Sequence, residues 1–424
     1  MHMHHLLFPV TLRRCLVHEL ITVQSVTWSF RLFQPYKSPG PDGVLPVMLH
    51  HVNNETIKWI SSIYRQCLLT NCMPSSWRNV RVTFIPKPGK SNYQLPRAYR
   101  PMSLASFLLK GLERIVDNYI RTDVLKQYPI SPNQHAFISD RSTDTALHSL
   151  KSQIQKAKDR GNYLLCAFLD IEGAFDRTNT CSVQKALTQF HVDESISAWI
   201  CNVLSKRVVF SSLNDFSSVR NVSGGCPQGG VLSPPLWTLV TDGLLNQLIK
   251  SGFRCIGYAD DIVIIIEGKV LPTLSDLMQH AFSLVERWCR SNELAINPTK
   301  VDLALFTNRR KFDMRHPHLS GYPVQLSKTV KYLGVTFDSK LNWFAHIDCK
   351  VKKANAILWQ CRSAVGQNWG FFPKMMFWIF QTIVRPILSH GCIVWSSACT
   401  KWQVQLKLQK LNRSGCLMIT GGMK

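Results

Sequence analysis

The chain has 424 residues, of which 45% are hydrophobic and 18% are charged. This composition excludes a disordered protein, and the length is enough for a sizeable core in two or three subdomains. The net charge is +24, and the segment after Asp348 holds 11 Lys or Arg residues and no acid. A solvated surface normally mixes both signs, so this acid-free end predicts a polyanionic partner, and we favour nucleic acid.

The fourteen cysteines include no Cys-x-x-Cys pair, and some, such as Cys166 and Cys392, lie in apolar runs. They predict reduced core residues of an intracellular protein, in the nucleus, the cytoplasm or both. No signal peptide is expected, because two arginines follow rather than precede the short apolar N-terminal stretch. The apolar run from Met375 to Trp395 includes an arginine, a proline and a histidine, so we expect a buried helical pair and no membrane partner.

The first third of the chain predicts a loop, a strand pair and several helices. Residues 1–34 carry no clear motif and are expected to be irregular. In chain order, the predictions are a loop from Pro35 to Gly43, a helical pattern through Arg65, a strand pair around Val80 to Lys87, and helices over Leu104–Tyr119 and Thr143–Lys158.

The middle of the chain predicts strands that end in acids. The apolar run Tyr163 to Leu169 predicts a strand followed by Asp170. The runs Phe253 to Gly257 and Ile262 to Ile266 flank Tyr258-Ala259-Asp260-Asp261, which predicts a β-hairpin with two carboxylates at its tip.

Helices are predicted around this hairpin. One begins at Ser233-Pro234, where Ser can cap the helix and Pro is tolerated in the first turn. Another covers Thr273 to Ser291, and residues 345–424 are expected to be helical. The predicted core positions of the Thr273 to Ser291 helix, at helical spacing, are Leu274, Leu277, Ala281, Leu284 and Trp288.

The three acids predict a metal site. Asp260 and Asp261 repel each other unless a cation lies between them, and Asp170 on a neighbouring strand supplies a third carboxylate. Hard oxygen ligands with open positions suit Mg²⁺, which is usually shared with substrate phosphates. A lone Asp at a strand end is ordinarily a turn or cap residue, but three acids in this setting predict phosphoryl transfer.

With these acids, the order of the motifs resembles that of the reverse transcriptases of non-LTR retrotransposons, most closely jockey-type elements. The resemblance covers roughly residues 30 to 424. In order they are Lys37-Ser38-Pro39-Gly40-Pro41-Asp42-Gly43, Ile85-Pro86-Lys87-Pro88-Gly89-Lys90, Tyr99-Arg100-Pro101-Met102-Ser103-Leu104, Asp170-Ile171-Glu172-Gly173-Ala174-Phe175-Asp176, Gly225-Cys226-Pro227-Gln228-Gly229-Gly230-Val231-Leu232-Ser233-Pro234, Tyr258-Ala259-Asp260-Asp261, Asn297-Pro298-Thr299-Lys300 and Val330-Lys331-Tyr332-Leu333-Gly334-Val335.

The resemblance implies an α+β right-hand polymerase. Its parts would be an N-terminal lead-in over residues 1–36, fingers over 37–160, a palm of antiparallel sheet and helices over 161–344, and a basic helical thumb over 345–424, with the reverse transcriptase domain at about 68–338. Such an enzyme extends a DNA primer on an RNA template with dNTPs, using two Mg²⁺ ions or Mn²⁺ in their place. The oligomeric state stays open.

Residue roles follow from the same resemblance. Asp170 and Asp260 would bridge both ions, Ile171 would offer its carbonyl, and Asp261 would have a lesser role. Lys300 would protonate the departing pyrophosphate. The implied nucleotide-binding residues are Lys87, Arg100, Gly173, Ala174, Phe175, Gln228 and Gly229. Phe175 would collide with a ribose 2′-hydroxyl, with core packing as the alternative. Surface charge is the alternative for the three basic residues, and Glu172 and Asp176 receive no role.

Two other functions stay open. A viral RNA-dependent RNA polymerase shares the palm but prefers a polar residue in place of Phe175 and Gly in place of Ala259. A decayed or domesticated copy would bind RNA through its basic end without catalysis, and Ala136, Ile138 and Val301 depart from the family pattern. No acid set for a ribonuclease H or endonuclease is evident, so we expect a fragment of a longer polypeptide.

Overall fold

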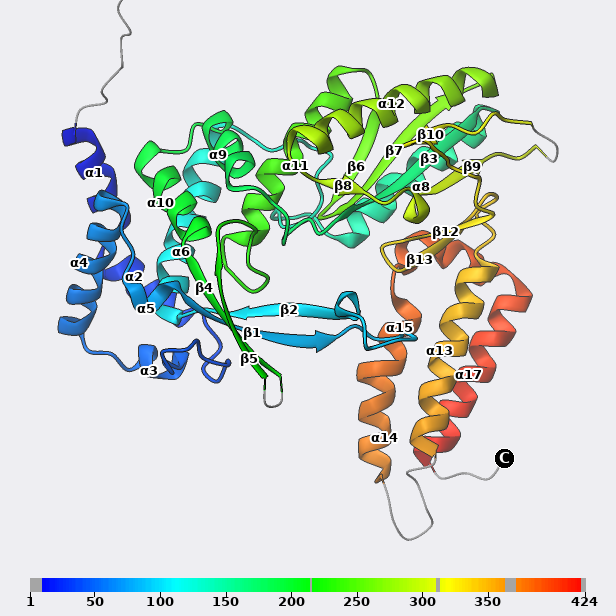
Figure 1. Ribbon diagram of the computed structural model, residues 1–424. Helices are drawn as coiled ribbons and strands as arrows, with labels where there is room; N and C mark the ends of the chain where they lie inside the picture. The colour runs from blue at the N-terminus through cyan, green and yellow to red at the C-terminus, as the bar shows by residue number, and fades with distance from the viewer. Residues whose placement is uncertain (1–9, 214–215, 310–312, 363–370, 421–424) are drawn as a thin grey trace, which may run out of the picture. The chain divides into compact units, whose positions relative to one another are not determined.

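The computed structural model describes residues 10–213, 216–309, 313–362 and 371–420, which form a mixed helix and sheet protein (Figure 1). The chain divides into two compact units. Unit 1 comprises Met1–Phe137, Ile171–Gln247 and Arg287–Ala295, and unit 2 comprises Ile138–Asp170, Leu248–Glu286 and Ile296–Lys424. Residues 138–160, which the resemblance assigned to the fingers, thus group with unit 2.

The prediction of an irregular N-terminal segment is wrong. Helices α1 (Val10–Leu20) and α2 (Val23–Arg31) lie there, and the Thr22 side chain caps α2. Val26 and Phe30 of α2 are buried, and the helix packs on α4 and α6. A few apolar residues at helical spacing are therefore sufficient to form a stable helix here, because α4 and α6 cover the apolar face of α2.

Unit 1 is mainly helical. Its other helices are α3 (Pro46–His50), α4 (Asn54–Thr70), α5 (Ser75–Arg78), α6 (Phe107–Tyr119) with a π turn at Ile120–Val124, α7 (Leu125–Gln127), α9 (Thr180–Gln189), α10 (Glu194–Ser205) and most of α11 (Ser233–Lys250). The Ser106 side chain caps α6. Ser233 does not act as the expected cap: it is the first residue of α11, and its hydroxyl donates to the Pro227 carbonyl at 2.7 Å.

A four-stranded sheet completes unit 1. Its strands are β1 (Asn79–Pro86), β2 (Tyr99–Leu104), β4 (Arg207–Leu213) and β5 (Phe216–Val222), in the order β2-β1-β4-β5. The predicted strand pair is confirmed as β1 and β2, which are antiparallel, whereas β1 and β4 are parallel.

The sheet of unit 2 carries the predicted acids. It consists of β3 (Tyr163–Glu172), β6 (Arg254–Tyr258), β7 (Asp261–Gly268), β8 (Ala295–Ile296) and β9 (Asp302–Phe306), in the order β6-β7-β3-β8, with β9 also paired to β3. The pairs of β3 with β7 and β9 and of β6 with β7 are antiparallel. The predicted strand and hairpin are therefore confirmed.

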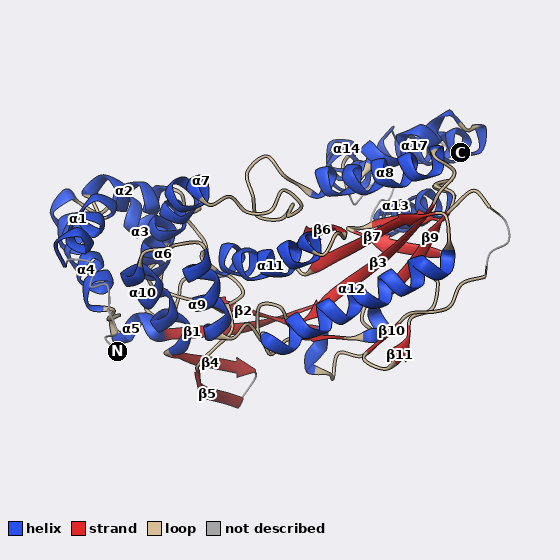
Figure 2. Ribbon diagram, turned by 90° about the horizontal axis from the view of Figure 1, so that it is seen from above, coloured by secondary structure: helices blue, strands red, loops and turns tan. Residues whose placement is uncertain are grey.

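Helices cover both faces of this sheet. In Figures 1 and 2, α8 (Thr143–Asp159) and the unit 2 part of α12 (Leu271–Ser291) lie on opposite faces. Four of the five predicted core residues of α12 are buried, but Leu277 is 40% exposed. The buried stripe also includes Met278 and Phe282, which the prediction did not name.

The rest of unit 2 consists of small hairpins and helices. The strands are β10 (His318–Leu319), β11 (Tyr322–Pro323), β12 (Thr329–Tyr332) and β13 (Val335–Asp338). The helices are α13 (Phe344–Arg362), α14 (Pro373–Ile379) with a π turn at Phe380–Val384, α15 (Arg385–Ser389), α16 (Cys392–Trp395) with a 3₁₀ turn at Ser396–Thr400, and α17 (Trp402–Thr420). The predicted helical character of residues 345–424 is confirmed over the described part of that segment.

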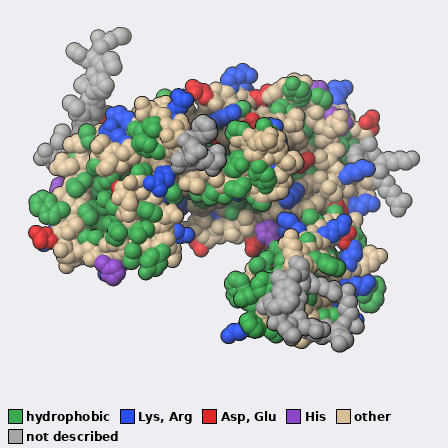
Figure 3. Space-filling model, turned by 60° about the horizontal axis from the view of Figure 1, so that its bottom comes forward, with side chains coloured by type: hydrophobic (Ala, Val, Ile, Leu, Met, Phe, Trp, Pro, Cys, Tyr) green, Lys and Arg blue, Asp and Glu red, His purple; other side chains and the backbone are tan. Residues whose placement is uncertain are grey.

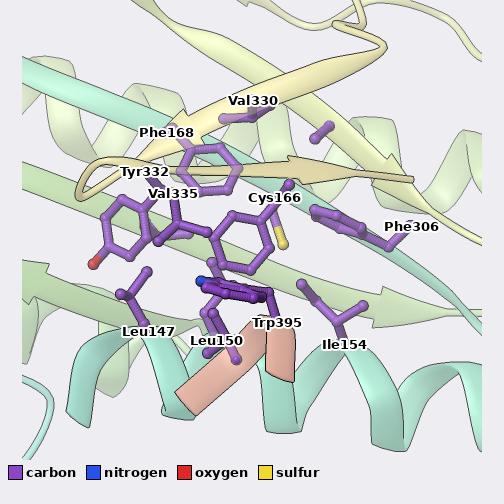
Figure 4. Close-up of a cluster of buried hydrophobic side chains, with 14 of the residues drawn as sticks. Leu147, Leu150, Ile154, Cys166, Phe168, Phe306, Val330, Tyr332, Val335 and Trp395 are labelled. Atoms are coloured by element: carbon purple, nitrogen blue, oxygen red, sulfur yellow. The ribbon is translucent and has the colours of Figure 1, made fainter. Parts of the chain in front are cut away.

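One hydrophobic cluster joins the sheet of unit 2 to these C-terminal elements. It includes Leu150 of α8, Phe168 of β3, Val335 of β13, Trp395 of α16 and Val404 of α17. Figure 4 shows Trp395 between side chains of α8 and those of the β12–β13 hairpin. The sheet therefore shares this cluster with part of the C-terminal helices, and a second cluster joins the rest of those helices through Ala354, Leu358, Phe380, Val384 and Leu411.

The prediction of a buried helical pair between Met375 and Trp395 is only partly correct. Met375 and Trp378 are 46% and 60% exposed, and Cys392 is exposed rather than buried. In the described parts of the chain, no single helix has the length and apolar composition to span a membrane, and one bent pair, Pro373–Ser389 with Cys392–Thr400, meets that test.

A buried histidine near the start of α13 predicts that the stability of the protein depends on pH. His346 of α13 is 1% exposed, and its Nδ1 accepts a hydrogen bond from the Thr336 amide at 3.1 Å. Burial, aided by the charges of Lys350 and His390, lowers the His346 pKa to about 4. The unfolded chain therefore binds the extra proton first, and this contribution to stability is complete above pH 6.5 and is lost as the pH falls towards 4.

We expect this histidine to reduce the free energy of unfolding by roughly 3 kcal/mol between pH 7 and pH 4. The comparison is urea unfolding of the wild type and His346→Asn, which keeps an acceptor near the position of Nδ1 but does not titrate in this range. Other titrating groups are common to both proteins, so the difference between the two pH curves isolates His346. Parallel curves would contradict the prediction.

Candidate active site

The three predicted metal-binding acids lie on two adjacent strands of unit 2. Asp170 of β3 is paired in register with Asp261, the first residue of β7. Tyr258 is paired with the same Asp261, so Ala259 and Asp260 form a two-residue turn beside it. Successive strand residues face opposite sides, so Asp170 and Asp261 point to the face that carries Phe168 and the hydrophobic cluster.

The turn that presents Asp260 is strained. Ala259 adopts a φ of 54°, in the left-handed region that costs a residue with a Cβ about 1–2 kcal/mol. Such strain persists where the surrounding structure determines the conformation, and it is concentrated at functional sites. The two flanking strands supply that constraint here, because the β6–β7 pairing continues for five residue pairs.

The three acids affect one another electrostatically. Burial, reinforced by the negative charges of Asp260 and Asp170, raises the pKa of Asp261 to about 7. The Lys300 ammonium lies 3.5 Å from the Asp170 carboxylate. The sheet thus concentrates negative charge at one end, and a lysine from the following motif partly balances it.

The donor set fits a hard divalent cation. Carboxylate oxygens are its preferred ligands, and like charges at this spacing are stabilised when such an ion binds. Among the described residues, however, no three His, Cys, Asp or Glu side chains already converge at metal-binding distance. The residues that would hold such an ion are Asp170, Asp260 and Asp261.

A buried tyrosine, Tyr332, lies near Asp261. Tyr332 of β12 is 3% exposed, and its ring packs on Phe168 with the centroids 5.5 Å apart. Burial raises the Tyr332 pKa, and the Asp261 charge raises it further. The predicted β12–β13 motif is therefore close to the acidic end of the sheet.

The predicted nucleotide-binding loop lies in unit 1. The Gln228 side-chain amide is 3.3 Å from both carboxylate oxygens of Asp176. The backbone carbonyl of Gln228 accepts a hydrogen bond from the Ser103 backbone amide at 2.7 Å. Gly229 has a φ of 105°, and a Cβ there would lie 2.9 Å from the Ser103 carbonyl oxygen. Only glycine fits this approach of the loop to β2.

Phe175 is half-buried beside this loop. Its ring lies against Trp237, with centroids 6.1 Å apart, and its carbonyl accepts the Cys226 amide at 2.6 Å. Gly173 adopts a φ of 64°, and Ala174 is buried. The 170–176 motif therefore leaves β3 at Glu172 and continues as a turn that contacts the Gln228 loop.

The two predicted triphosphate ligands differ in their surroundings. Burial raises the pKa of Asp176, and the nearby charge of Lys87 partly offsets that rise. The Lys87 ammonium donates a hydrogen bond to the Arg97 carbonyl at 3.1 Å. Arg100 is exposed on β2, opposite Ile85 of β1. Unit 1 thus brings Lys87, Phe175 and Gln228 together around Asp176.

Comparison with known proteins identifies the family. The family model for reverse transcriptase (RNA-dependent DNA polymerase) matches residues 85–337, which is more than half of the chain. The chain belongs to the reverse transcriptase family. The predicted family is confirmed, and the matched residues include Lys87, Asp170, Asp260, Asp261 and Lys300.

Curated relatives of this reverse transcriptase come from non-LTR retrotransposons. The chain is 25% identical over 377 residues to the retrovirus-related Pol polyprotein of type-1 retrotransposable element R1 from Bradysia coprophila, covering 88% of this chain and 37% of the relative. It is 26% identical over 378 residues to the RNA-directed DNA polymerase of mobile element jockey from Drosophila melanogaster, covering 85% and 40%. The chain therefore spans about two fifths of the length of these relatives.

Among solved structures, a telomerase from Candida tropicalis superposes with a TM-score of 0.43 and 10% identity, over 68% of this chain and 59% of the telomerase. At that level of superposition the likeness carries no argument about function.

Sequence reasoning missed three residues of this reverse transcriptase. Asp176 received no role because alternation along a strand directs it away, but β3 ends at Glu172 and Asp176 lies in the following turn. Glu113 and Arg207 were not singled out, although both are buried and hydrogen-bonded to the ends of the Gln228 loop. The sequence offers one sign of each: Glu113 is a charged residue within an apolar helical pattern, and Arg207 is a charged residue at the start of a strand.

Proposed function

We propose that this chain is an RNA-directed DNA polymerase that extends a primer 3′-hydroxyl with dNTPs on an RNA template. The observation that carries the proposal is the register pairing of Asp170 with Asp261, beside a strained turn that presents Asp260. Three carboxylates at one end of a sheet match the chemistry of a two-cation phosphoryl transfer.

In this proposal Asp170, Asp260 and Asp261 hold two Mg²⁺ ions, and the Ile171 carbonyl adds an oxygen ligand. Divalent cations bound there would lower the pKa of the primer hydroxyl and neutralise charge on the triphosphate. Lys300, 3.5 Å from Asp170, is placed to give a proton to the leaving pyrophosphate.

The residues of unit 1 would bind the nucleotide. Lys87 and Arg100 would contact the triphosphate, because ammonium and guanidinium groups both bind phosphate oxygens strongly. Gln228 and Gly229 would contact the sugar and base pair, and the backbone of Gly173 and Ala174 would line the same place. Phe175 would exclude a 2′-hydroxyl.

We further infer a right-hand arrangement with the β1–β2 region as fingers, the five-stranded sheet as palm and α13 to α17 as thumb. The chain would work inside the cell, in the nucleus, the cytoplasm or both, as expected of a retrotransposon enzyme. The test is primer extension by the purified chain on a homopolymeric RNA template, with and without Mg²⁺. No extension by a folded protein would contradict the proposed activity.

RNA binding without catalysis is the second candidate. It is favoured by a basic cluster formed by Lys331 of β12 with Lys350 and Lys353 of α13. Burial lowers the pKa of Lys350, and the charges of Lys353 and Lys331 lower it further. Lys and Arg side chains gather beside hydrophobic ones on the helical part of unit 2 (Figure 3, lower right). A phosphate would relieve the repulsion within this cluster.

We therefore expect Lys353→Gln to weaken binding of a primer–template duplex and to lower the slope of log K against log salt concentration by about 1. Fluorescence anisotropy over a range of salt concentrations measures both quantities. Lys58→Gln, at an exposed position of α4, makes the same charge change away from the cluster and should leave the slope unchanged. Equal salt slopes for the two variants would show that the basic cluster does not contact the nucleic acid.

A further inference from the structure

Two buried charged residues hold the two ends of the Gly224–Leu232 loop, which carries Gln228. Both lie in unit 1, as the loop does. Neither belongs to the motifs that gave the family resemblance, and neither has a role in the proposed chemistry.

Glu113 of α6 holds the C-terminal end of the loop. Its side chain is 4% exposed, and its carboxylate accepts the Val231 amide at 2.8 Å. Burial raises the Glu113 pKa, while the amides of Val231 and Leu232 and the charges of Lys110 and Arg207 lower it. An ionised carboxylate accepts such amides about twice as strongly as a neutral acceptor does.

Arg207, the first residue of β4, holds the other end. It is 7% exposed, and its guanidinium donates to the carbonyls of Gly224, Gly225 and Leu204, with the Gly225 contact at 2.6 Å. A planar guanidinium presents five donors in a fixed fork that spans several carbonyls, whereas a lysine ammonium has three donors on one nitrogen at the end of a flexible chain. Because Arg207 and Glu113 each shift the pKa of the other, the two charges are close enough to interact.

The middle of the loop has contacts of its own: the Ser233 hydroxyl donates to the Pro227 carbonyl at 2.7 Å, and the Gln228 side-chain amide lies 3.3 Å from the Asp176 carboxylate. Cys226 donates to the Phe175 carbonyl, and the Gln228 carbonyl accepts the Ser103 amide. Burying a carboxylate and a guanidinium is costly, and a hydrophobic pair of similar volume is often at least as stable. Two buried ions placed at the ends of a glycine-rich loop are thus better explained by the loop conformation than by stability.

We propose that Glu113 and Arg207 are positioning residues, which fix both ends of the Gly224–Leu232 loop and so hold Gln228 in place for the incoming nucleotide. This inference rests on the proposed polymerase function. The two residues act through the loop, and neither is expected to touch the substrate.

The test compares Glu113→Gln and Arg207→Lys with Asp117→Asn. Asp117 lies one turn further along α6, is largely buried and pairs with Arg121 at 2.8 Å, so its variant removes a carboxylate from the same helix without touching the loop. We expect Glu113→Gln and Arg207→Lys to raise the KM for dNTP about tenfold with kcat within about threefold. Asp117→Asn should change neither value by more than twofold.

Hydrogen exchange provides a readout that does not need activity. The amides of residues 225–232 should exchange at least about tenfold faster in both loop variants than in the wild type and Asp117→Asn. If the wild type does not polymerise, the proposed function fails, and the exchange rates alone decide whether the two residues hold the loop.

Three results would overturn the inference: an unchanged KM in both variants, unchanged loop exchange, or an equal effect of Asp117→Asn. Faster loop exchange with an unchanged KM would leave a purely structural clamp and would also refute the positioning role. If Glu113→Gln fails to fold, Arg207→Lys tests the same inference from the other end of the loop.

Discussion

Replacing Asp260 with asparagine is expected to slow primer extension at least about a thousandfold, which corresponds to about 4 kcal/mol of transition-state stabilisation. Asparagine has almost the same shape, so the β6–β7 turn should persist. What is lost is one of the three carboxylates that would hold the proposed cations. Binding of Mn²⁺ to the purified protein, followed by electron paramagnetic resonance, should weaken at least about tenfold in parallel.

Asp276→Asn is the matched control, because Asp276 is exposed on α12 of the same unit and carries the same substitution. It should extend primers and bind Mn²⁺ as the wild type does. RNA binding should be within twofold of wild type in both variants, since the loss of one acid does not weaken phosphate contacts elsewhere. Extension by Asp260→Asn at a rate near the wild-type value would remove Asp260 from the metal site.

Phe175→Val is expected to raise ribonucleotide use relative to deoxynucleotide use by at least about tenfold, or roughly 1.4 kcal/mol of lost discrimination. The Phe175 ring is half-buried against Trp237, and its backbone bond to Cys226 does not depend on the side chain. Valine therefore leaves the loop contact in place while removing the bulk that would meet a 2′-hydroxyl. The measurement is kcat/KM for each nucleotide on one template.

Phe84→Val controls for the loss of an aromatic ring, because Phe84 is 42% exposed on β1 of the same unit. Its nucleotide ratio should equal that of the wild type. If Phe175→Val lowers stability but leaves the ratio unchanged, Phe175 is a packing partner of Trp237, and the RNA-dependent RNA polymerase alternative regains weight.

The acidic hairpin was predictable because its signals are local. A largely apolar run before Asp260 and a β-branched run after Asp261 indicate strands, and a two-residue connection between strands permits only a tight turn. The strand before Asp170 is equally clear. The strain at Ala259 could not be predicted, because its φ results from the register of β6 and β7 rather than from its own type.

The errors arose where distant contacts decide the structure. The N-terminal helices are stabilised by α4 and α6, which their own sequence does not reveal. Leu277 was predicted to be buried because helical spacing alone does not show which of two adjacent apolar residues, Leu277 or Met278, faces the core. Glu113 and Val231 are 118 residues apart in the chain, so only the folded structure brings the carboxylate to the loop.

The shared core of unit 2 has a genetic consequence. Val394, Trp395, Ala398 and Val404 pack in the same cluster as Phe168 and Val263, which neighbour the acids on β3 and β7. A stop codon or frameshift between codons 338 and 404 would leave every proposed catalytic motif in the reading frame and still remove hydrophobic side chains that pack with Phe168 and Val263. Such a truncated chain is expected to fold less stably, so intact motifs alone do not show that a sequence encodes a folded protein.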